Sequence, residues 1–448
     1  MNDSPPPSAA PAVHPRRRVG VWQAVAVCVG TVIGAGIFRS PAVVAGNVDS
    51  ETAMLLAWAF GGALSLAGAL CFAEMAAAFP DEGGDYHFLR RAFGPRAGFL
   101  FAWSRFAVIH TGSIAMLGFV LGDYFAPFLG LPPGTSPVVA AVAIAALATL
   151  NLAGLRFGIG TQVGLMIVVL GGLVAVFAAG IAIAASGWAP LQPVKSPGAG
   201  PASLGTALVF VFLAYGGWSD AATLSAEMKD ARRGIAKALV TGMTMVTALY
   251  LAANWAYLRG LGLGGVAESA APASDLMLVA FGPVAQAVMV GVVAVTAITS
   301  MNAILIAGSR TTYAAARDLG GLGSLAHWHE ARGTPAQALV AMAVVALALV
   351  GLGAWTRSGF STIVDYLSPV YWIFLTMSGA AVVILRRRHP AVERPFRVPL
   401  YPVLPLVFMA TSAYMVWASL AFVKAGALAG LGVLAAGLGL MVWLERRN

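Results

Sequence analysis

Two glycine-rich stretches decide how this chain folds. Residues 29–38 read VGTVIGAGIF, and residues 210–220 read FVFLAYGGWSD. Each stretch lies inside a long apolar run, where a helix is expected. A glycine in a helix interior costs about 1 kcal/mol relative to alanine. Closely spaced glycines therefore predict a break in the helix at both places.

The apolar runs around these stretches predict an all-α integral membrane protein. Hydrophobic residues make up 59% of the 448 positions, charged residues make up only 10%, and the mean hydropathy is +0.83. Roughly a quarter of a soluble chain is charged, so a water-facing surface of this size could not be covered. Runs long enough to cross a bilayer, about 20 residues each, predict twelve spans at residues 20–46, 52–79, 97–127, 136–154, 161–186, 203–228, 237–258, 283–309, 335–353, 360–385, 402–423 and 426–444.

The two predicted breaks lie in the first and the sixth span. Broken helices at corresponding positions indicate an inverted repeat whose binding site lies near the middle of the membrane. We therefore expect one five-helix repeat at residues 19–190, a second at 201–388, and two appended helices at 400–445. Residues 1–18 are polar and rich in proline, and we expect them to form a disordered cytosolic tail.

The basic residues predict the orientation in the membrane. With a cytosolic N-terminus, 21 Lys and Arg residues fall in cytosolic segments and 4 in outer loops, while Arg39 and Arg105 remain inside spans. Cytosolic loops carry such an excess of Lys and Arg, so both termini are expected in the cytosol. The 23 Arg against 4 Lys, with no processing signal, suggest the inner membrane of a bacterium with a GC-rich genome.

Other partners are not indicated. The net charge of +9 does not predict nucleic-acid binding, because the basic residues occupy short gaps between apolar runs instead of one face of a polar fold. Cys28 and Cys71 lie in apolar runs, where a thiol behaves as a small hydrophobe. The sequence predicts no cofactor and no metal site, and it leaves the oligomeric state open.

The broken helices suggest a receptor for a zwitterion. A half-helix that begins after Gly36 presents unpaired N–H groups and the positive end of its dipole, which suit a carboxylate. A half-helix that ends near Ala214 presents unpaired C=O groups, which suit an ammonium group. The simpler alternative is helix packing, since Gly30 and Gly34 form a G-xxx-G pattern. Two breaks in register favour the binding site.

The same residues resemble the amino acid–polyamine–organocation superfamily of permeases, in particular its bacterial L-type amino acid transporter-like branch. Residues 34–38 match the pattern G-[SA]-G-I-F, and residues 214–220 are similar to A-Y-G-G-W-x-D. Residues 80–86 and 92–95 resemble P-x-x-G-G-x-Y followed by A-F-G-P, and residues 302–318 are similar to N-x…-S-R…-A-R-D. Together these matches extend over most of the chain.

The resemblance implies a LeuT-type fold of ten plus two helices and secondary transport of amino acids by alternating access. It also implies that Trp218 shapes or gates the side-chain pocket. The implied substrate-binding residues are Ile33, Gly34, Ala35, Gly36 and Ile37 in the first span and Phe212, Leu213, Ala214, Tyr215, Gly216 and Trp218 in the sixth. The fifth span has no lysine, whereas many relatives carry one there, so the coupling mechanism stays open, with protons as a candidate.

Polar residues inside the spans are candidates for coupling or gating, because a charge is costly to bury in a membrane. Arg39 could attract an anionic substrate, and Arg105 could act in transport or pair with a carboxylate on another helix. Asp220 could cap the next half-helix or carry a proton, and His110 could titrate near neutral pH. The full set of candidates is Arg39, Glu74, Arg105, His110, Asp220, Ser300 and Asn302.

Three competing functions can be weighed against transport of amino acids. A membrane enzyme needs a converging set of catalytic side chains, and the six scattered histidines do not supply one. A channel should show a polar stripe or a charged ring along several helices, whereas here the polar features gather at two breaks. A polyamine or other organocation carrier would use the carbonyl end but would leave the carboxylate end without a partner.

Overall fold

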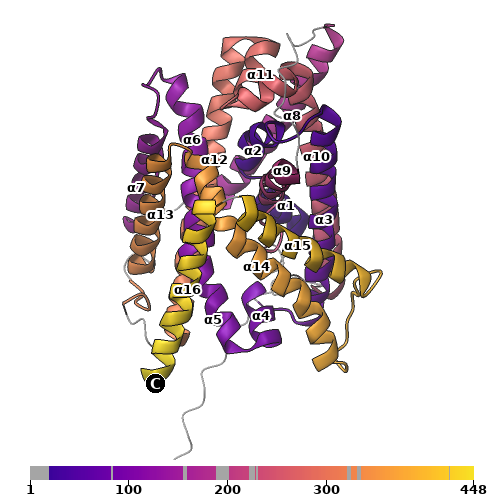
Figure 1. Ribbon diagram of the computed structural model, residues 1–448, viewed down its shortest axis with the longest axis vertical. Helices are drawn as coiled ribbons and strands as arrows, with labels where there is room; N and C mark the ends of the chain where they lie inside the picture. The colour runs from indigo at the N-terminus through magenta and orange to yellow at the C-terminus, as the bar shows by residue number, and fades with distance from the viewer. Residues whose placement is uncertain are drawn as a thin grey trace, which may run out of the picture.

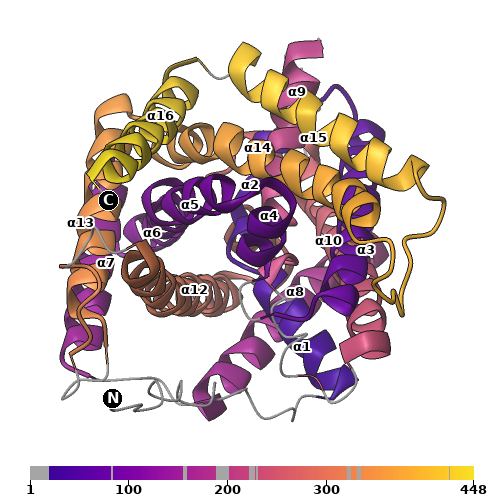
Figure 2. The same cartoon turned by 90° about the horizontal axis from the view of Figure 1, so that it is seen from below.

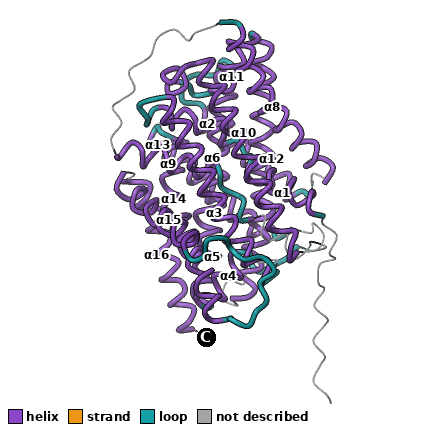
Figure 3. The backbone as a smooth tube through the Cα atoms, turned by 90° about the vertical axis from the view of Figure 1, so that its right-hand side faces the viewer, coloured by secondary structure: helices purple, strands orange, loops and turns teal. Residues whose placement is uncertain are grey.

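The structure is a computed structural model that describes residues 20–81, 84–154, 159–187, 201–220, 228, 231–319, 324–329, 334–422 and 424–447. The expected cytosolic tail at residues 1–18 lies outside the described residues. In the described ranges the chain forms helices and isolated β-bridges but no strand. Figure 3 shows these helices as tubes, with loops gathered mainly at the two ends of the molecule.

The helices follow one another along the whole chain. They are α1 (Val21–Val32), α2 (Gly36–Ala45), α3 (Glu51–Ala78), α4 (Asp85–Phe93), α5 (Pro95–Ser104), η1 (Arg105–His110), α6 (Thr111–Phe128), α7 (Ser136–Leu152), α8 (Ile159–Ala185), α9 (Pro201–Ala214), α10 (Ala231–Glu268), α11 (Pro272–Phe281), α12 (Pro283–Leu319), α13 (Ala336–Thr356), α14 (Gly359–Arg388), α15 (Val403–Phe422) and α16 (Lys424–Arg447).

This architecture confirms the prediction of an all-α membrane protein. Nine of the described helices are long and apolar enough to cross a bilayer, and the bent pair of α1 and α2 brings the number to as many as ten. The shorter apolar helices α7 and α9 occupy the two remaining predicted spans. The division into two repeats of five helices stays a prediction.

The helices stand side by side, so that the molecule has two ends (Figure 1). We call them the α4 end, where the C-terminus also lies, and the α11 end. Helices α15 and α16 pack against α14 at the periphery (Figure 2). Large apolar side chains such as Val138, Ile167 and Val284 are exposed on the surface. A bilayer would cover such a surface, since the hydrocarbon core is the solvent for spanning helices.

The first span breaks at the predicted place. Helix α1 ends at Val32, α2 begins at Gly36, and the two axes are bent by 50°. The backbone N–H groups of Ile33 and Gly34 close the last turn of α1 on Val29 O and Val32 O. The chain then turns into α2 through Ala35. The break is thus a short, hydrogen-bonded turn between two half-helices.

The sixth span also ends its first half where predicted. Helix α9 stops at Ala214, and residues 215–219 form turns. Gly217 has φ +103°, a backbone conformation that glycine adopts at no steric cost and other residues rarely adopt. The glycine pair therefore does more than permit a break, because one of its members has a conformation that requires glycine.

The spacing of apolar residues did not predict three elements. Helix α4 carries Asp85 in its first turn and Arg90 and Arg91 in its last, a distribution that complements the helix dipole. Helix α11 is a short helix at the opposite end. The segment η1 is a π-helix inside the third span, a rare form that occurs mostly as single turns at functional sites.

Candidate substrate site at the helix breaks

The two breaks lie directly against each other. A Cβ atom built on Gly36, at the start of α2, would lie 3.7 Å from the Cα atom of Ala214, at the end of α9. A Cβ atom built on Gly217 would lie 2.4 Å from the carbonyl oxygen of Thr31 in α1, closer than real Cβ atoms approach. The backbone of each broken span thus touches the backbone of the other.

The Tyr250 hydroxyl on α10 links the two broken spans. Its oxygen lies 3.1 Å from Val32 O and 3.0 Å from Ala214 O, and the side chain is fully buried. The single hydroxyl proton serves one carbonyl at a time or is shared between both. Tyr250 lies inside an apolar run with no local signal, so its role could not be predicted from the sequence.

The Tyr215 side chain belongs to the packing around the breaks. Its hydroxyl donates to Trp58 O on α3 at 3.0 Å, and its ring lies 5.0 Å from that of Tyr250 and 5.9 Å from that of Trp58. Both tyrosines and Trp58 are almost fully buried. The side chain of Tyr215 is therefore taken up by packing, and only its backbone can contact a ligand.

The backbone groups at the two helix ends differ in sign. In the first turn of α2, Phe38 N–H donates to Ala35 O at 3.1 Å, whereas the N–H groups of Gly36 and Ile37 have no acceptor within their own helix, as at any helix N-terminus. At the end of α9, Val211 O accepts from Tyr215 N–H, Leu213 O from Gly216 N–H, and Ala214 O from Tyr250. These described hydrogen bonds leave Phe212 O as the acceptor in the last turn of α9, so a donor end faces an acceptor end.

Trp218 closes the site toward α3 and α14. Its ring packs edge-on against Phe72 at 5.0 Å, and together with Ser65 and Tyr371 it lines a cavity of about 10 Å³. A volume of about 10–15 Å³ is what a single water needs. The cavity is therefore too small for an amino acid in this conformation.

Arg39 lies beyond the break, toward the α11 end. Its Nε atom lies 3.2 Å from the Asp123 carboxylate on α6, and its guanidinium group lies over the Phe360 ring at 5.5 Å. Asp123 also accepts a hydrogen bond from the Ser136 hydroxyl at 2.8 Å. This ion pair joins the start of the second half of span 1 to the third span.

Arg105 lies on the other side of the breaks, toward the α4 end. Its Nη1 atom lies 2.8 Å from the Asp220 carboxylate, just after the second break. The other edge of the guanidinium group donates to His110 Nε2 at 2.8–3.1 Å. The neutral ring then carries its proton on Nδ1, a buried atom with no hydrogen-bond partner among the described residues.

Asp85 on α4 lies near this group. Its carboxylate accepts from the Ser219 hydroxyl, and one of its oxygens is buried without a partner in the described structure. Burial raises the pKa of the Asp85 carboxyl to about 7, an effect that the nearby Arg105 opposes. The π-helix η1, the turn after α9 and the start of α4 thus meet in one polar cluster, which we call the Arg105 cluster (Asp85, Arg105, His110, Ser219 and Asp220).

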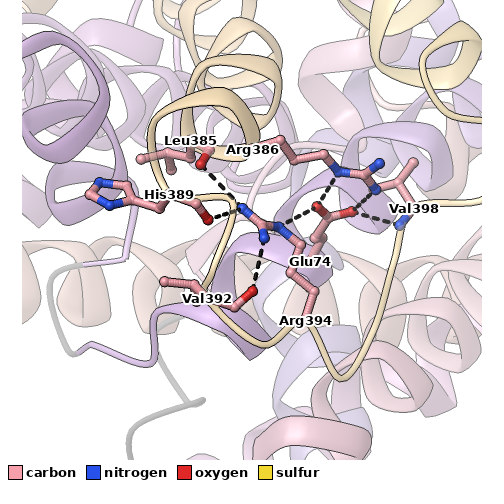
Figure 4. Close-up of polar contacts among 7 residues, drawn as sticks. All are labelled: Glu74, Leu385, Arg386, His389, Val392, Arg394 and Val398. Atoms are coloured by element: carbon pink, nitrogen blue, oxygen red, sulfur yellow. Dashed lines mark hydrogen bonds and ion pairs between the residues drawn. The ribbon is translucent and has the colours of Figure 1, made fainter.

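Glu74 is not part of the Arg105 cluster and is bound by arginines from α14 and from the segment after it. Both of its oxygens are held by Arg386 at 2.5–2.6 Å, one also accepts from Val398 N–H at 2.7 Å, and Arg394 lies 3.5 Å away (Figure 4). Arg394 in turn donates to carbonyl groups around the end of α14, among them Leu385 O. The arrangement fastens the segment after α14 to α3, and it leaves Glu74 little freedom.

The two candidates on α12 face different surroundings. Asn302 is buried and accepts from the Asn151 amide on α7 at 2.6 Å. Ser300 is half-buried, and its neighbours Thr296 and Thr299 donate to carbonyl groups of their own helix. The described residues include no group of three His, Cys, Asp or Glu side chains that could hold a metal ion.

Two broken apolar helices whose opposite ends are in contact are typical of membrane transport proteins. Residues 19–441 match the amino acid permease family, and the chain belongs to that family. This confirms the resemblance found in the sequence. It makes the protein an amino acid transporter, not an enzyme, and the polyamine alternative finds no support.

Individual relatives match over nearly the whole chain. The serine/threonine exchanger SteT of Bacillus subtilis (strain 168) is 29% identical over 415 residues, which cover 90% of this chain and 91% of that protein. The b(0,+)-type amino acid transporter 1 of Mus musculus is 29% identical, with 90% and 82% covered. The cystine/glutamate transporter of Homo sapiens is 28% identical, with 92% and 82% covered.

Proposed function

We propose that this protein exchanges small neutral amino acids across a cytoplasmic membrane by alternating access, with the substrate backbone held between the two helix breaks. The contact of the Gly36 end of α2 with the Ala214 end of α9 carries the proposal. A donor end and an acceptor end a few ångströms apart match the two charges of an α-amino acid.

The substrate carboxylate would bind at the start of α2, on the backbone of Ala35, Gly36 and Ile37. Unpaired N–H groups and the positive end of the helix dipole both favour an anion there. Ile33 and Gly34 would line the same side, and no atom outside the local backbone lies within 4 Å of a Cβ atom built on Gly34. This open position leaves room for the ligand.

The substrate ammonium group would bind at the end of α9. Phe212 O is the acceptor that the described hydrogen bonds leave there, next to Leu213 and Ala214. Trp218 and Gly216 would bound the side-chain pocket, together with Tyr371, whose hydroxyl would lie 3.3 Å from a Cβ atom built on Gly216. Such close walls favour a small side chain. The serine/threonine exchanger among the relatives supports this size class and an exchange mechanism.

The α4 end would face the cytosol. It carries the C-terminus and the basic residues of α4 and of the end of α14, and cytosolic loops are enriched in Lys and Arg. The bacterial relative supports the inner membrane of a bacterium as the location. A proton gradient remains a candidate for coupling, and the assay below separates it from exchange.

Exchange in proteoliposomes tests the proposal. Purified protein is reconstituted into proteoliposomes either with or without unlabelled serine inside. Uptake of labelled serine, threonine, alanine, leucine and putrescine is then measured, each with and without an inward proton gradient. We expect uptake of the small amino acids that depends on internal serine. Uptake that needs the proton gradient but no internal serine would replace exchange by symport.

Two substitutions connect the transport to the breaks. Gly36→Leu places a branched side chain against α9 and should abolish uptake. Gly291→Leu adds the same side chain on the exposed surface of α12, where no atom lies within 4 Å of a Cβ atom built on Gly291, and should leave uptake unchanged. If neither small nor large amino acids are moved by the unmodified protein, the proposal is wrong.

A further inference from the structure

We propose that two ion pairs on the third span, Arg39–Asp123 and Arg105–Asp220, are the latches that close the site alternately toward the α11 end and the α4 end. This inference rests on the alternating-access function proposed above. It gives a specific role to Arg39, Arg105 and Asp220, which the sequence marks only as candidates for coupling or gating, and it adds Asp123.

The positions of the two pairs mirror each other. Arg39 stands three residues after Gly36 in the first broken span, and Asp220 stands three residues after Gly217 in the sixth. Each is thus the first charged residue beyond the glycine at which its span breaks. Both pair with the third span, which presents Asp123 to Arg39 and Arg105 to Asp220. The signs are reversed between the two pairs.

The third span carries these partners on opposite sides of the breaks. Asp123 and Arg105 are 18 residues apart, which corresponds to about 27 Å along a helix. Arg39 leads toward the α11 end and Asp220 toward the α4 end, so the two pairs lie above and below the candidate site. Each pair ties one broken span to the same unbroken one.

Both pairs are formed in this structure, and the cavity beside Trp218 is too small for an amino acid. The Arg39 pair is backed by the Ser136 hydroxyl and the Phe360 ring, and the Arg105 pair by His110. Opening the site toward either end requires a broken span to move away from its neighbours. The ion pair at that end must then separate while the other stays closed.

The burial of the pairs suits reversible contacts. The side chains of Arg39, Asp123 and Arg105 are about one-fifth exposed, and that of Asp220 is about half exposed. Asp220 is the most exposed of the four, and a partly exposed pair is less stabilising than a fully buried one. The Glu74 carboxylate is 3% exposed and held by several donors at once, which marks a permanent anchor. The same structure thus separates latches from anchors.

Labelling of one buried position reports both latches. Ser40, beside Arg39 on α2, is 3% exposed. Ser40→Cys is introduced into a Cys28→Ser, Cys71→Ser background, and its rate of reaction with an uncharged, membrane-impermeant maleimide is measured from the α11 side. We expect Asp123→Asn and Arg39→Gln each to raise the rate about tenfold. Asp220→Asn and Arg105→Gln should lower it, because they favour opening toward the α4 end.

Two further variants complete the test: one exchanges the charges of a latch, and the other is a control that removes an exposed ion pair elsewhere. The double variant Arg39→Asp, Asp123→Arg should restore the original rate, and it keeps the test open if a single variant folds poorly. Glu51→Gln removes the exposed ion pair between α3 and Arg259 on α10 and should not change labelling. Changes of the same sign at the two latches, or no change at either, would overturn the proposal. Labelling needs no transported substrate, so this outcome is distinct from a failure of the proposed function.

Discussion

Gly217→Ala tests whether the two broken spans depend on each other. The methyl group would stand 2.4 Å from Thr31 O and 3.0 Å from Thr31 C, and φ at this position is +103°. A side chain in this region of backbone conformation costs about 1–3 kcal/mol, and overpacking of a well-filled site adds about 1–3 kcal/mol. We therefore expect the variant to lose roughly 2–6 kcal/mol of stability.

Thermal inactivation of the purified protein measures this loss. Samples are heated in detergent, and the fraction that stays monodisperse is followed by size-exclusion chromatography. The half-inactivation temperature should fall by several degrees for Gly217→Ala. Gly34→Ala is the matched control, since it adds the same methyl group at the other break, where nothing lies within 4 Å and the backbone is not left-handed. Its half-inactivation temperature should not change.

The two variants also differ in a second property. A ligand present at 100 times its dissociation constant stabilises the folded state by about 2.7 kcal/mol, so excess serine should raise the half-inactivation temperature of the unmodified protein. Gly34→Ala should reduce this protection, because its methyl group occupies the open position offered to the substrate. Equal stability of Gly217→Ala and Gly34→Ala would refute the contact between the breaks.

Three further predictions concern buried polar groups. Tyr250→Phe removes the described donor to Ala214 O, while Val32 O keeps the Gly34 N–H, and it should cost about 1–3 kcal/mol in the same thermal assay. Tyr257→Phe removes a buried hydroxyl with no partner among the described residues and should be neutral or stabilising. Glu74→Gln leaves Arg386 and Arg394 without their carboxylate partner and should cost about 3–5 kcal/mol of stability. Glu445→Gln removes an exposed ion pair and should cost less than about 1 kcal/mol. Similar values for both variants would contradict the role of Glu74 as an anchor. Burial raises the pKa of Asp85 from 3.8 to about 7, so the contribution of Asp85 to stability should fall as the pH rises from about 4 to about 7. The difference in stability between Asp85→Asn and the unmodified protein should therefore increase over this pH range.

Local patterns were enough to predict the spans. Each of the twelve predicted runs contains at least one described helix, because the need for about 20 apolar residues per span is met within each segment. The end of α1 and the end of α9 were predicted for the same reason, since the cost of glycine in a helix acts at its own position. The short helices α4 and α11 were not predicted, because α4 is rich in charged residues and α11, although apolar, has only 10 residues.

The tertiary structure alone decided which side chains meet. Arg39 was flagged as a charge within a span, but its partner Asp123 is 84 residues away, and nothing near either residue points to the other. Tyr250 and Asp85 are inconspicuous in the sequence, and they matter because other helices bring Val32 O, Ala214 O and Ser219 to them. Glu74 became an anchor through Arg386 and Arg394, which follow it by more than three hundred positions.

The physical reason for this division is the range of the forces involved. Hydropathy and backbone strain act within one helix, so the number of spans, their breaks and the charge balance of the loops can be read from neighbouring residues. Ion pairs and buried hydrogen bonds depend on distances of about 3 Å between helices, and those distances exist only after the helices have packed. The sequence therefore determined where the helices cross and break, while packing decided that the Gly36 end of α2 meets the Ala214 end of α9 and that one unbroken span holds a charge for each.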